Sequence, residues 1–268
     1  MSEKNSPVAF VTGGASGLGE ACARMLAARG TTVVVSDIDL TKAQRVAEEI
    51  GGLAIRCDVT KSHEVDAAVD KAVATYGRLD VMINNAGIAP PPNPDRFERA
   101  VANQMSRFDP TITPLPLDVL TAMDDDQWDT MIRIHLYGTF YGTRAALRHM
   151  TPHRRGSVIN ISSILGLKPS PMAPHYSTAK AGIIALTKSV ASETAQFGLR
   201  VNAVCPGWAD TPLLEPMSDQ MRAVIVSQIG MGRLATSNEI AELVCFLASP
   251  ASSYCTGEVF SASGGYAS

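Results

Sequence analysis

Short, continuously apolar segments alternate with helix-like segments along the whole chain. Runs rich in β-branched residues predict strands at 8–12, 31–37, 53–59, 79–85, 156–162, 199–205 and 258–262. Strands without polar alternation are typical of parallel sheets that are covered on both faces. Right-handed crossovers through the intervening helices then predict an α/β fold, a doubly wound, Rossmann-type parallel sheet of seven strands.

A single domain is expected over residues 1–268, because no part of the sequence suggests a second domain and the chain contains no internal repeat. One segment breaks the rhythm. Residues 88–117 hold seven prolines and no sustained period, which predicts a proline-rich insertion after the fourth strand. At most a short helix is expected there, at about 95–107. A long helix is expected next, from about Asp125 to Met150.

Composition narrows the classes of partner. The net charge is −3 and the basic residues are scattered, which argues against nucleic acid or an acidic membrane surface. No apolar run approaches the ~18 residues of a membrane span, and the first ten residues contain no signal-type segment. The five cysteines show no metal-ligand spacing and suit a reducing compartment. We therefore expect a cytoplasmic protein without a metal site.

A glycine-rich turn, "VTGGASGLGE", directly follows the first strand. Gly13, Gly17 and Gly19 allow backbone N–H groups to approach a pyrophosphate at the start of the next helix. Ser16 and Leu18 belong to the same turn and are assigned to the cofactor site with it. The alternative is a tight turn that serves only close packing of the helix.

Asp37 ends the second strand, about 20 residues after the glycine turn, where a carboxylate can accept the ribose hydroxyls of NAD. The same carboxylate would repel a 2′-phosphate, and 13–19 and 36–39 contain no Lys or Arg to offset it. NAD is therefore predicted rather than NADP, with Ile38 beside the site. A capping or turn role is the alternative for Asp37, and Asp39 is assigned to the turn before the next helix.

Two further strand ends are candidates for cofactor contacts. Asp58 is a candidate for the adenine amino group, with Val59 packing beside it, but an N-cap role fits the spacing equally well. Asn85, Ala86 and Gly87 end the fourth strand in "NNAG", where small residues let a flat ring and a ribose pass close to the backbone.

These segments together resemble the short-chain dehydrogenase/reductases of the single-domain type. The resemblance rests on "TGGASGLG", Asp37, "CDVT", "NNAG", "INISS", "YSTAK", "VNAVCPG" and "TGEVFSASGG", which occur in the family's order. Only 88–117 has no counterpart. The resemblance implies NAD(P)-dependent oxidation of an alcohol or reduction of a ketone, and a strand order of 3-2-1-4-5-6-7. It also implies a homo-oligomer, most often a tetramer.

Tyr176 and Lys180 lie four residues apart and share one face of a predicted helix. Alcohol oxidation needs a base, and a nearby cation lowers the pKa of a tyrosine from its ordinary value of ~10. Lys180 is expected to be that cation, and the resemblance implies that it also binds the nicotinamide ribose. The resemblance selects Ser163 to bond the substrate oxygen. Ser162 is the weaker candidate, with a strand-end hydroxyl bonded to backbone as the alternative.

His135 occupies a position where the family usually has an asparagine that holds a water of the proton path. Imidazole can also bond a water and titrates near neutrality, so we expect His135 to keep that path and to add pH sensitivity. The alternative is a neutral, hydrogen-bonded core histidine with the proton path rerouted.

The segment after the sixth strand, "CPGWADT", is expected to face the nicotinamide. Pro206 and Gly207 shape the turn, and Thr211 is placed to bond the carboxamide, with an N-cap role as the alternative. Residues 208–231 correspond to the family's substrate lid. Its Leu, Met and Val side chains favour an apolar pocket, with Trp208 as a possible wall, although ordinary packing explains them equally well.

The sequence thus predicts an NAD-dependent oxidoreductase that interconverts a secondary alcohol and a ketone on a small, apolar or cyclic substrate. A 3-hydroxyacyl thioester or dihydrodiol dehydrogenase is the alternative. A non-catalytic NAD-binding protein is the rival class, and Ser163, Tyr176 and Lys180 argue against it. The insertion leaves the ligand edge of the sheet and is expected to extend the pocket rim. It could equally form an oligomer contact or a surface loop.

Overall fold

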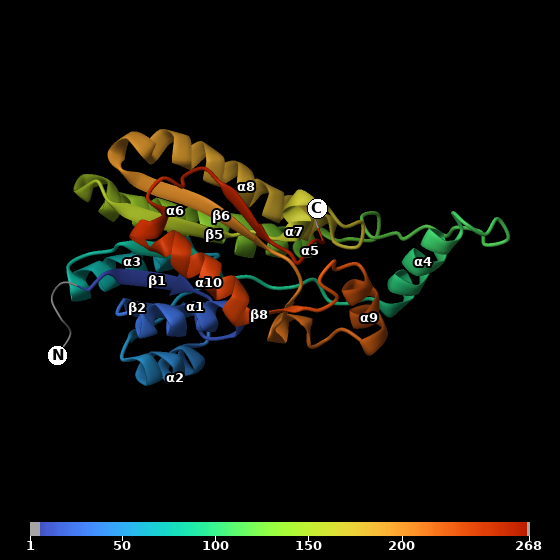
Figure 1. The fold of residues 1–268 in the computed structure, drawn as a ribbon, viewed down its shortest axis with the longest axis horizontal. Helices are drawn as coiled ribbons and strands as arrows, with labels where there is room; N and C mark the ends of the chain where they lie inside the picture. The colour runs from blue at the N-terminus through green and yellow to red at the C-terminus, as the bar shows by residue number, and fades with distance from the viewer. Residues whose placement is uncertain (1–5, 267–268) are drawn as a thin grey trace.

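A seven-stranded parallel sheet forms the centre of the computed structural model, which describes residues 6–266 (Figure 1). Its order is β3-β2-β1-β4-β5-β6-β9. The strands are β1 (Val8–Thr12), β2 (Thr32–Asp37), β3 (Leu53–Arg56), β4 (Val81–Asn84), β5 (Gly156–Ile161), β6 (Leu199–Pro206) and β9 (Val259–Ala262). All six neighbouring pairs are parallel, so the predicted fold and the order implied by the resemblance are confirmed.

Helices cover both faces of the sheet, which explains why its strands are apolar at consecutive positions. On β1, Ala9 and Val11 join a core cluster with α1 (Gly17–Ala28), α2 (Leu40–Ile50) and α10 (Ser237–Ala248). Val8 and Phe10 point the other way, into a cluster with α3 (Ser62–Tyr76), α6 (Gly138–Met150) and α8 (Pro174–Thr194). Successive side chains on a strand alternate between faces, so both sets must be apolar. No helix within residues 6–266 is long and apolar enough to cross a membrane.

The long helix expected over 125–150 is present, with one π-helical turn inside it. Helix α5 (Asp125–Ile132) runs into a π-helical turn, η1 (Arg133–Tyr137), which continues as α6. A π-turn accommodates one extra residue within a helix and is frequent at functional sites. Here the turn contains His135, which is buried.

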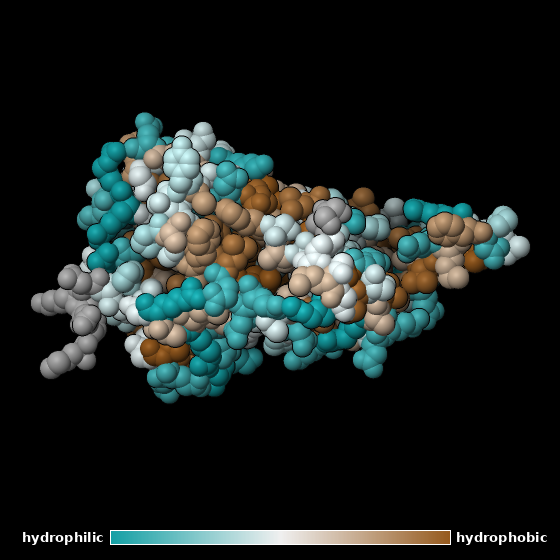
Figure 2. All heavy atoms as spheres, viewed as in Figure 1, coloured by the Kyte–Doolittle hydropathy of each residue, from teal (hydrophilic) through white to brown (hydrophobic). Residues whose placement is uncertain are grey.

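The insertion contains the short helix that the sequence predicted, α4 (Pro94–Met105), which projects from the body of the molecule (Figure 1). None of its residues is buried. Its side chains bond the returning backbone: Asn103 binds both N–H and C=O of Leu115, at 2.7 and 2.6 Å, and Arg99 donates to the Pro116 carbonyl at 2.8 Å. Figure 2 shows hydrophobic and hydrophilic atoms mixed on this projection.

The predicted lid begins and ends at two short strands that pair with each other. Helix α9 (Asp219–Ser227) and the 3-10 turn η4 (Pro212–Leu214) lie between two short strands, β7 (Ala209–Asp210) and β8 (Ala235–Thr236). These strands pair in parallel and were not predicted, because two residues show no period. The remaining elements are α7 (Ile164–Leu167), η2 (Thr151–His153), η3 (Ala195–Phe197) and η5 (Pro250–Ser252).

Candidate functional site

The carboxyl ends of β1 and β4 are joined by Thr12 and Asn85. The Thr12 hydroxyl accepts hydrogen bonds from the backbone N–H groups of Asn85 and Ala86, at 2.9 and 3.1 Å. The Asn85 amide in turn donates to the carbonyls of Thr12 and Gly13, at 3.1 and 3.0 Å. The predicted glycine turn and the "NNAG" segment therefore form one unit. Thr12, which was not among the predicted site residues, is its central side chain.

The glycine turn fits a dinucleotide phosphate. A Cβ on Gly19 would lie 2.1 Å from the Gly13 carbonyl oxygen, so this approach requires glycine. Gly13 has φ +61°, and its Cβ would lie 2.8 Å from the Ala86 Cα. Ser16 is the N-cap residue of α1, but its side chain makes no capping bond. The N–H groups of the first helical turn, which includes Leu18, are thus left for another acceptor.

Asp37 is anchored at the end of β2. Its Oδ2 accepts from the Ala15 N–H at 3.2 Å and its Oδ1 accepts from the Asp39 N–H at 3.1 Å. Each carboxylate oxygen has a further lone pair, so both can still accept ribose hydroxyls. Asp39 caps α2 by accepting from the Lys42 N–H at 3.1 Å, as predicted. Ile38 lies between the two aspartates with 60% of its surface exposed.

Asp58 forms a turn of its own after β3. Its Oδ1 accepts from the N–H and the hydroxyl of Thr60, at 3.0 and 2.7 Å, and its Oδ2 lies 3.5 Å from the Lys61 Nζ. Burial raises the pKa of Asp58, but the bonds from Thr60 and Lys61 prevail, and the pKa lies below its ordinary value. Helix α3 has Lys61 at its N-cap, so the capping alternative for Asp58 is wrong. The neighbouring Val59 packs against Gly138 at the start of α6.

Tyr176 and Lys180 lie on one face of α8, as the spacing predicted. The Lys180 Nζ is 5.5 Å from the centre of the Tyr176 ring and donates to the Ile161 carbonyl at 2.8 Å. The side chain of Ser163, the N-cap residue of α7, lies near the Tyr176 hydroxyl and lowers its pKa. The Ser162 hydroxyl instead donates to the Lys180 carbonyl at 2.8 Å, which confirms its backbone-bonded alternative.

Burial dominates the ionisation of this pair. It raises the pKa of Tyr176 to about 12, although Ser163 opposes the shift. It lowers the pKa of Lys180 to about 7. We expected Lys180 to draw the pKa of Tyr176 downward, and in the protein alone it does not. The physical reason is that Lys180 is itself only partly charged near neutrality and directs its Nζ at a backbone carbonyl.

His135 lies against the Tyr176 ring, with the ring centres 5.1 Å apart and the planes at 81°. Its Nε2 is 2.9 Å from the Ile88 carbonyl oxygen and accepts from the Ile88 backbone N–H at 3.2 Å, two contacts that call for opposite tautomers of the ring. Nδ1 is buried and has no hydrogen-bond partner among residues 6–266. Burial and the charge of Lys180 hold the pKa of His135 well below 6.5.

Neither prediction for His135 therefore fits completely. The expected titration near neutrality is wrong, because the ring is held neutral. The alternative of a neutral, hydrogen-bonded core histidine agrees with its burial, its lowered pKa and the contacts of Nε2, whereas Nδ1 has no partner within residues 6–266.

The turn after β6 brings Thr211 to the glycine turn. Pro206 ends β6, and the Gly207 N–H donates to the Ala262 carbonyl at 2.8 Å. A Cβ on Gly17 would lie 3.6 Å from the Thr211 Cβ, so these residues are neighbours. Thr211 does hold the N-cap position of η4, but its hydroxyl makes no capping bond. Its side chain therefore remains suited to a ligand, and only the position agrees with the N-cap alternative.

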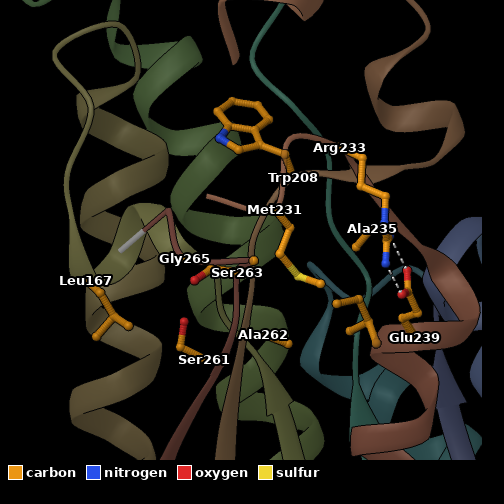
Figure 3. Close-up of a pocket in the computed structure, with 12 residues that line it drawn as sticks. Leu167, Trp208, Met231, Arg233, Ala235, Glu239, Ser261, Ala262, Ser263 and Gly265 are labelled. Atoms are coloured by element: carbon orange, nitrogen blue, oxygen red, sulfur yellow. Dashed lines mark hydrogen bonds and ion pairs between the residues drawn. The ribbon is translucent and has the colours of Figure 1, made fainter. Parts of the chain in front are cut away.

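A cavity of about 530 Å³ lies beside this turn, between the lid base and the end of β9 (Figure 3). Trp208 and Met231 line it, as does the ion pair of Arg233 and Glu239, at 2.7 Å. Trp208 therefore does wall a cavity. Leu167 of α7 contributes to the lining, but Ser163, Tyr176 and Lys180 do not. This cavity is not where the candidate chemical groups meet.

Comparison with known proteins agrees with this architecture. The family model described as short chain dehydrogenase matches residues 7–222. A cis-4-hydroxycyclohexanecarboxylate dehydrogenase of Sinomonas cyclohexanicum is 40% identical over 264 residues, covering 97% of this chain and 96% of that protein. A 3-oxoacyl-[acyl-carrier-protein] reductase of Thermotoga maritima is 34% identical, with 96% of each chain covered.

Among solved structures, a 3-ketoacyl-(acyl-carrier-protein) reductase from Brucella melitensis, complexed with NADH, superposes with a TM-score of 0.83. It is 30% identical and covers 99% of this chain and 100% of that one. The chain therefore belongs to the short-chain dehydrogenase family of oxidoreductases, which use a nicotinamide cofactor.

Proposed function

We propose that the protein is an NAD-dependent oxidoreductase that interconverts a secondary alcohol and a ketone on an apolar ring. The observation that carries this proposal is the half-buried Tyr176 beside Ser163 and Lys180, whose Nζ lies 5.5 Å from the centre of its ring. Ser163 follows the carboxyl end of β5, so this group lies at the same end of the sheet as the glycine turn and Asp37, which follow or end β1 and β2. The hydroxycyclohexane substrate in the name of the Sinomonas relative supports a ring with a secondary hydroxyl.

Bound NAD⁺ supplies the hydride acceptor and a positive charge. To take the hydroxyl proton, Tyr176 must first lose its own phenolic proton, which the neutral form of Lys180 would accept, and Ser163 holds the oxygen from which the substrate proton leaves. In the protein alone the phenol is held protonated, because burial raises its pKa to about 12. Lys180, whose pKa is about 7, gains its full charge as a phenolate forms next to it. A further positive charge beside Tyr176 would therefore favour the state in which Tyr176 and Lys180 are both ionised.

His135 is proposed to extend the proton path from Lys180. The neutral ring contacts the Ile88 backbone through Nε2, and its buried Nδ1 has no partner within residues 6–266, so Nδ1 can bond a water. Because the ring stays neutral, His135 acts as a hydrogen-bonding group and adds no ionisation of its own near neutrality.

The adenosine end supports NAD. Asp37 is fixed by two backbone N–H groups, so its carboxylate cannot swing away from a 2′-phosphate without losing both bonds. Ile38, next to it, offers no cation.

A substrate panel tests the proposed function. NADH formation is followed by absorbance with cyclohexanols, including a hydroxycyclohexanecarboxylate, with 3-hydroxyacyl thioesters and with dihydrodiols, each with NAD⁺ and NADP⁺. We expect the highest kcat/KM for ring alcohols with NAD⁺. Turnover confined to thioesters with NADP⁺ would contradict the substrate and the cofactor. Tight NAD⁺ binding without turnover of any substrate would favour a non-catalytic protein.

A 3-hydroxyacyl thioester is the second candidate substrate. It is favoured by the names of the Thermotoga relative and of the Brucella structure, both acyl-carrier-protein reductases. The NADH in the Brucella structure shows that such a reductase can bind the unphosphorylated cofactor, so Asp37 alone does not decide between the two substrates.

A further inference from the structure

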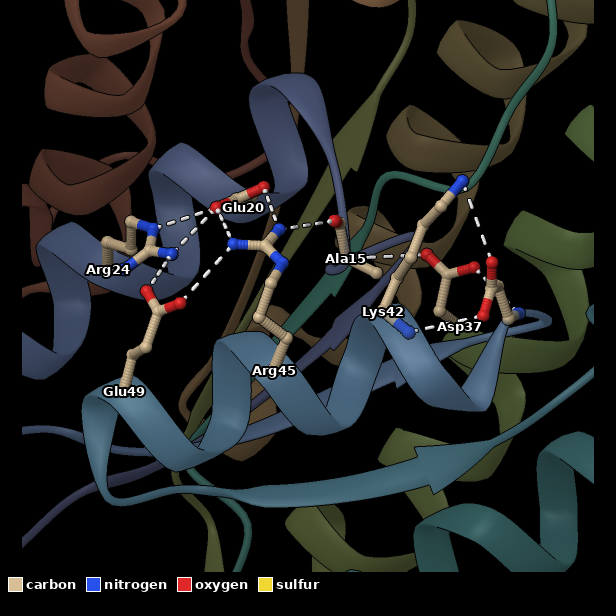
Figure 4. Close-up of polar contacts among 8 residues, drawn as sticks. Ala15, Glu20, Arg24, Asp37, Lys42, Arg45 and Glu49 are labelled. Carbon is tan, nitrogen blue, oxygen red and sulfur yellow. Dashed lines mark hydrogen bonds and ion pairs between the residues drawn. The ribbon is translucent and has the colours of Figure 1, made fainter.

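An ion network joins α1 to α2 beside the glycine turn (Figure 4). Glu20 of α1 accepts from both terminal nitrogens of Arg45, at 3.2 and 3.0 Å. Glu20 also accepts from Arg24, at 2.9 and 2.8 Å, and Glu49 pairs with both arginines. Glu20 is the most buried member, with 22% of its side chain exposed. Burial raises the pKa of Glu20, but Arg45 and Arg24 prevail and hold it below its ordinary value.

Arg45 also reaches the glycine turn itself. Its Nη2 lies 3.5 Å from the Ala15 carbonyl oxygen. The N–H of the same Ala15 donates to the Asp37 carboxylate, at 3.2 Å. The Arg45 guanidinium therefore contacts the backbone carbonyl of buried Ala15, and the Asp37 carboxylate contacts its backbone N–H. Figure 4 shows Ala15 between the two side chains. Since Asp37 marks the position of the ribose hydroxyls, Arg45 lies one residue away from the place where a 2′-phosphate would be.

We propose that Glu20 determines cofactor selectivity together with Asp37, by keeping Arg45 from binding a 2′-phosphate. This inference rests on the proposed NAD dependence. Guanidinium binds phosphate through two parallel N–H groups, and in Arg45 both of these are bound to Glu20. Replacing the Glu20 carboxylate by an amide of the same shape removes its negative charge and one of its two acceptor oxygens, so at least one of these Arg45 nitrogens is released from residue 20.

A purely structural role predicts a different outcome. If the network only fastens α1 to α2, weakening it should affect all adenosine ligands alike. Arg24 provides the matched control, because it bonds the same Glu20 and Glu49 but, within residues 6–266, no bond joins it to Ala15.

Two adenosine fragments isolate this end of the cofactor site from the chemistry of the nicotinamide. Calorimetry gives the Kd of 5′-AMP and of 2′,5′-ADP for the full chain and for Glu20→Gln, Glu20→Gln/Arg45→Gln and Arg24→Gln. In Glu20→Gln we expect 2′,5′-ADP to bind about tenfold more tightly and 5′-AMP to change by less than about twofold. The double variant should lose the gain, and Arg24→Gln should keep the ratio of the unsubstituted chain. The gain should shrink as NaCl is raised from about 0.05 to about 0.5 M, because the pair is partly exposed.

The inference is overturned if both ligands shift equally in Glu20→Gln, or if the gain survives removal of Arg45. The proposed NAD dependence fails separately, if the unsubstituted chain prefers 2′,5′-ADP to 5′-AMP. Should Glu20→Gln fail to fold, Glu20→Ala and Glu20→Ala/Arg45→Gln take its place. Glu20→Ala is then expected to gain affinity for 2′,5′-ADP, and the double variant must lose that gain for the inference to stand.

Discussion

The two ends of the candidate cofactor site are built on opposite electrostatic principles. At the adenosine end the charged groups are partly exposed and paired, as Glu20 is with Arg45 and Asp39 with Lys42. At the catalytic end Lys180 and His135 are buried, with 3% and 2% of their surfaces exposed, and burial shifts their pKa values. Exposed pairs are weak and screened by salt, whereas buried groups respond strongly to one added charge. We infer that one end selects the cofactor and the other performs the chemistry.

Tyr176→Phe should give the largest effect, because it removes only the hydroxyl that moves the proton. We expect kcat for ring-alcohol oxidation to fall about 10³-fold, while the Kd of NAD⁺ changes by less than about twofold. Stopped-flow NADH formation and calorimetry measure the two quantities. A variant that kept more than about a tenth of the rate would remove Tyr176 from the proton transfer.

Lys180→Met tests whether Lys180 is buried as a near-neutral amine, through the pH dependence of the free energy of unfolding. The pKa of Lys180 is about 7 in the folded chain and ordinary, at 10.5, once unfolded. Between these values the unfolded state binds more protons, so this lysine makes the folded chain more stable as pH rises. From pH 7 to 9, the free energy of unfolding should rise by about 2 kcal/mol more in the unsubstituted chain than in Lys180→Met.

Urea denaturation at both pH values gives this difference, and other titrating groups cancel between the two chains. Tyr176 acts in the opposite sense only above about pH 10, where the unfolded phenol ionises first. Equal pH dependence of the two chains would mean that Lys180 is not buried as a near-neutral amine.

His135 is tested by a pair of variants. Since its ring contributes hydrogen bonds and no charge, His135→Asn should keep kcat within about threefold, and His135→Ala should lose about tenfold. No ionisation step attributable to His135 should appear in the rate between pH 6 and 9. If both variants matched the unsubstituted chain across that range, the proposed proton path through His135 would be wrong.

Asp37→Asn should have the smallest effect on rate, because it acts at the exposed end. We expect the ratio of NADP⁺ to NAD⁺ affinity to rise about tenfold, with kcat under saturating NAD⁺ almost unchanged. Asp39→Asn is the matched control. Asp39 caps α2, and asparagine is an equally good N-cap residue, so Asp39→Asn should leave both the stability and the affinity ratio almost unchanged. A shift of the ratio in both variants would show that local charge, rather than Asp37, sets the preference.

The sequence predicted the sheet well because both of its faces are buried. Val33, Val34 and Val35 of β2 are all almost fully buried, so the strand appears as one apolar run that no helix period explains. The glycine turn and the shared face of Tyr176 and Lys180 could be predicted equally well, since both depend on residues that are close in sequence.

Features that depend on packing between distant segments could not be predicted. The π-turn at His135 accommodates one extra residue in a helix whose local sequence reads as continuous. The contact of Arg45 with Ala15 spans 30 residues and depends on the packing of α2 against α1. The direction of the Lys180 Nζ, towards the Ile161 carbonyl, follows from the burial of α8 on β5 and β6 and not from the spacing of the motif.

The most direct test of the account is the ionisation of Tyr176 itself, with and without NAD⁺. The phenolate absorbance of the unsubstituted chain minus that of Tyr176→Phe isolates this residue during a pH titration. We predict that Tyr176 stays protonated to about pH 11 in the protein alone, given its pKa of about 12, and ionises at a clearly lower pH when NAD⁺ is bound. The same titration curve with and without NAD⁺ would contradict the claim that the positive charge of the cofactor lowers the pKa of Tyr176.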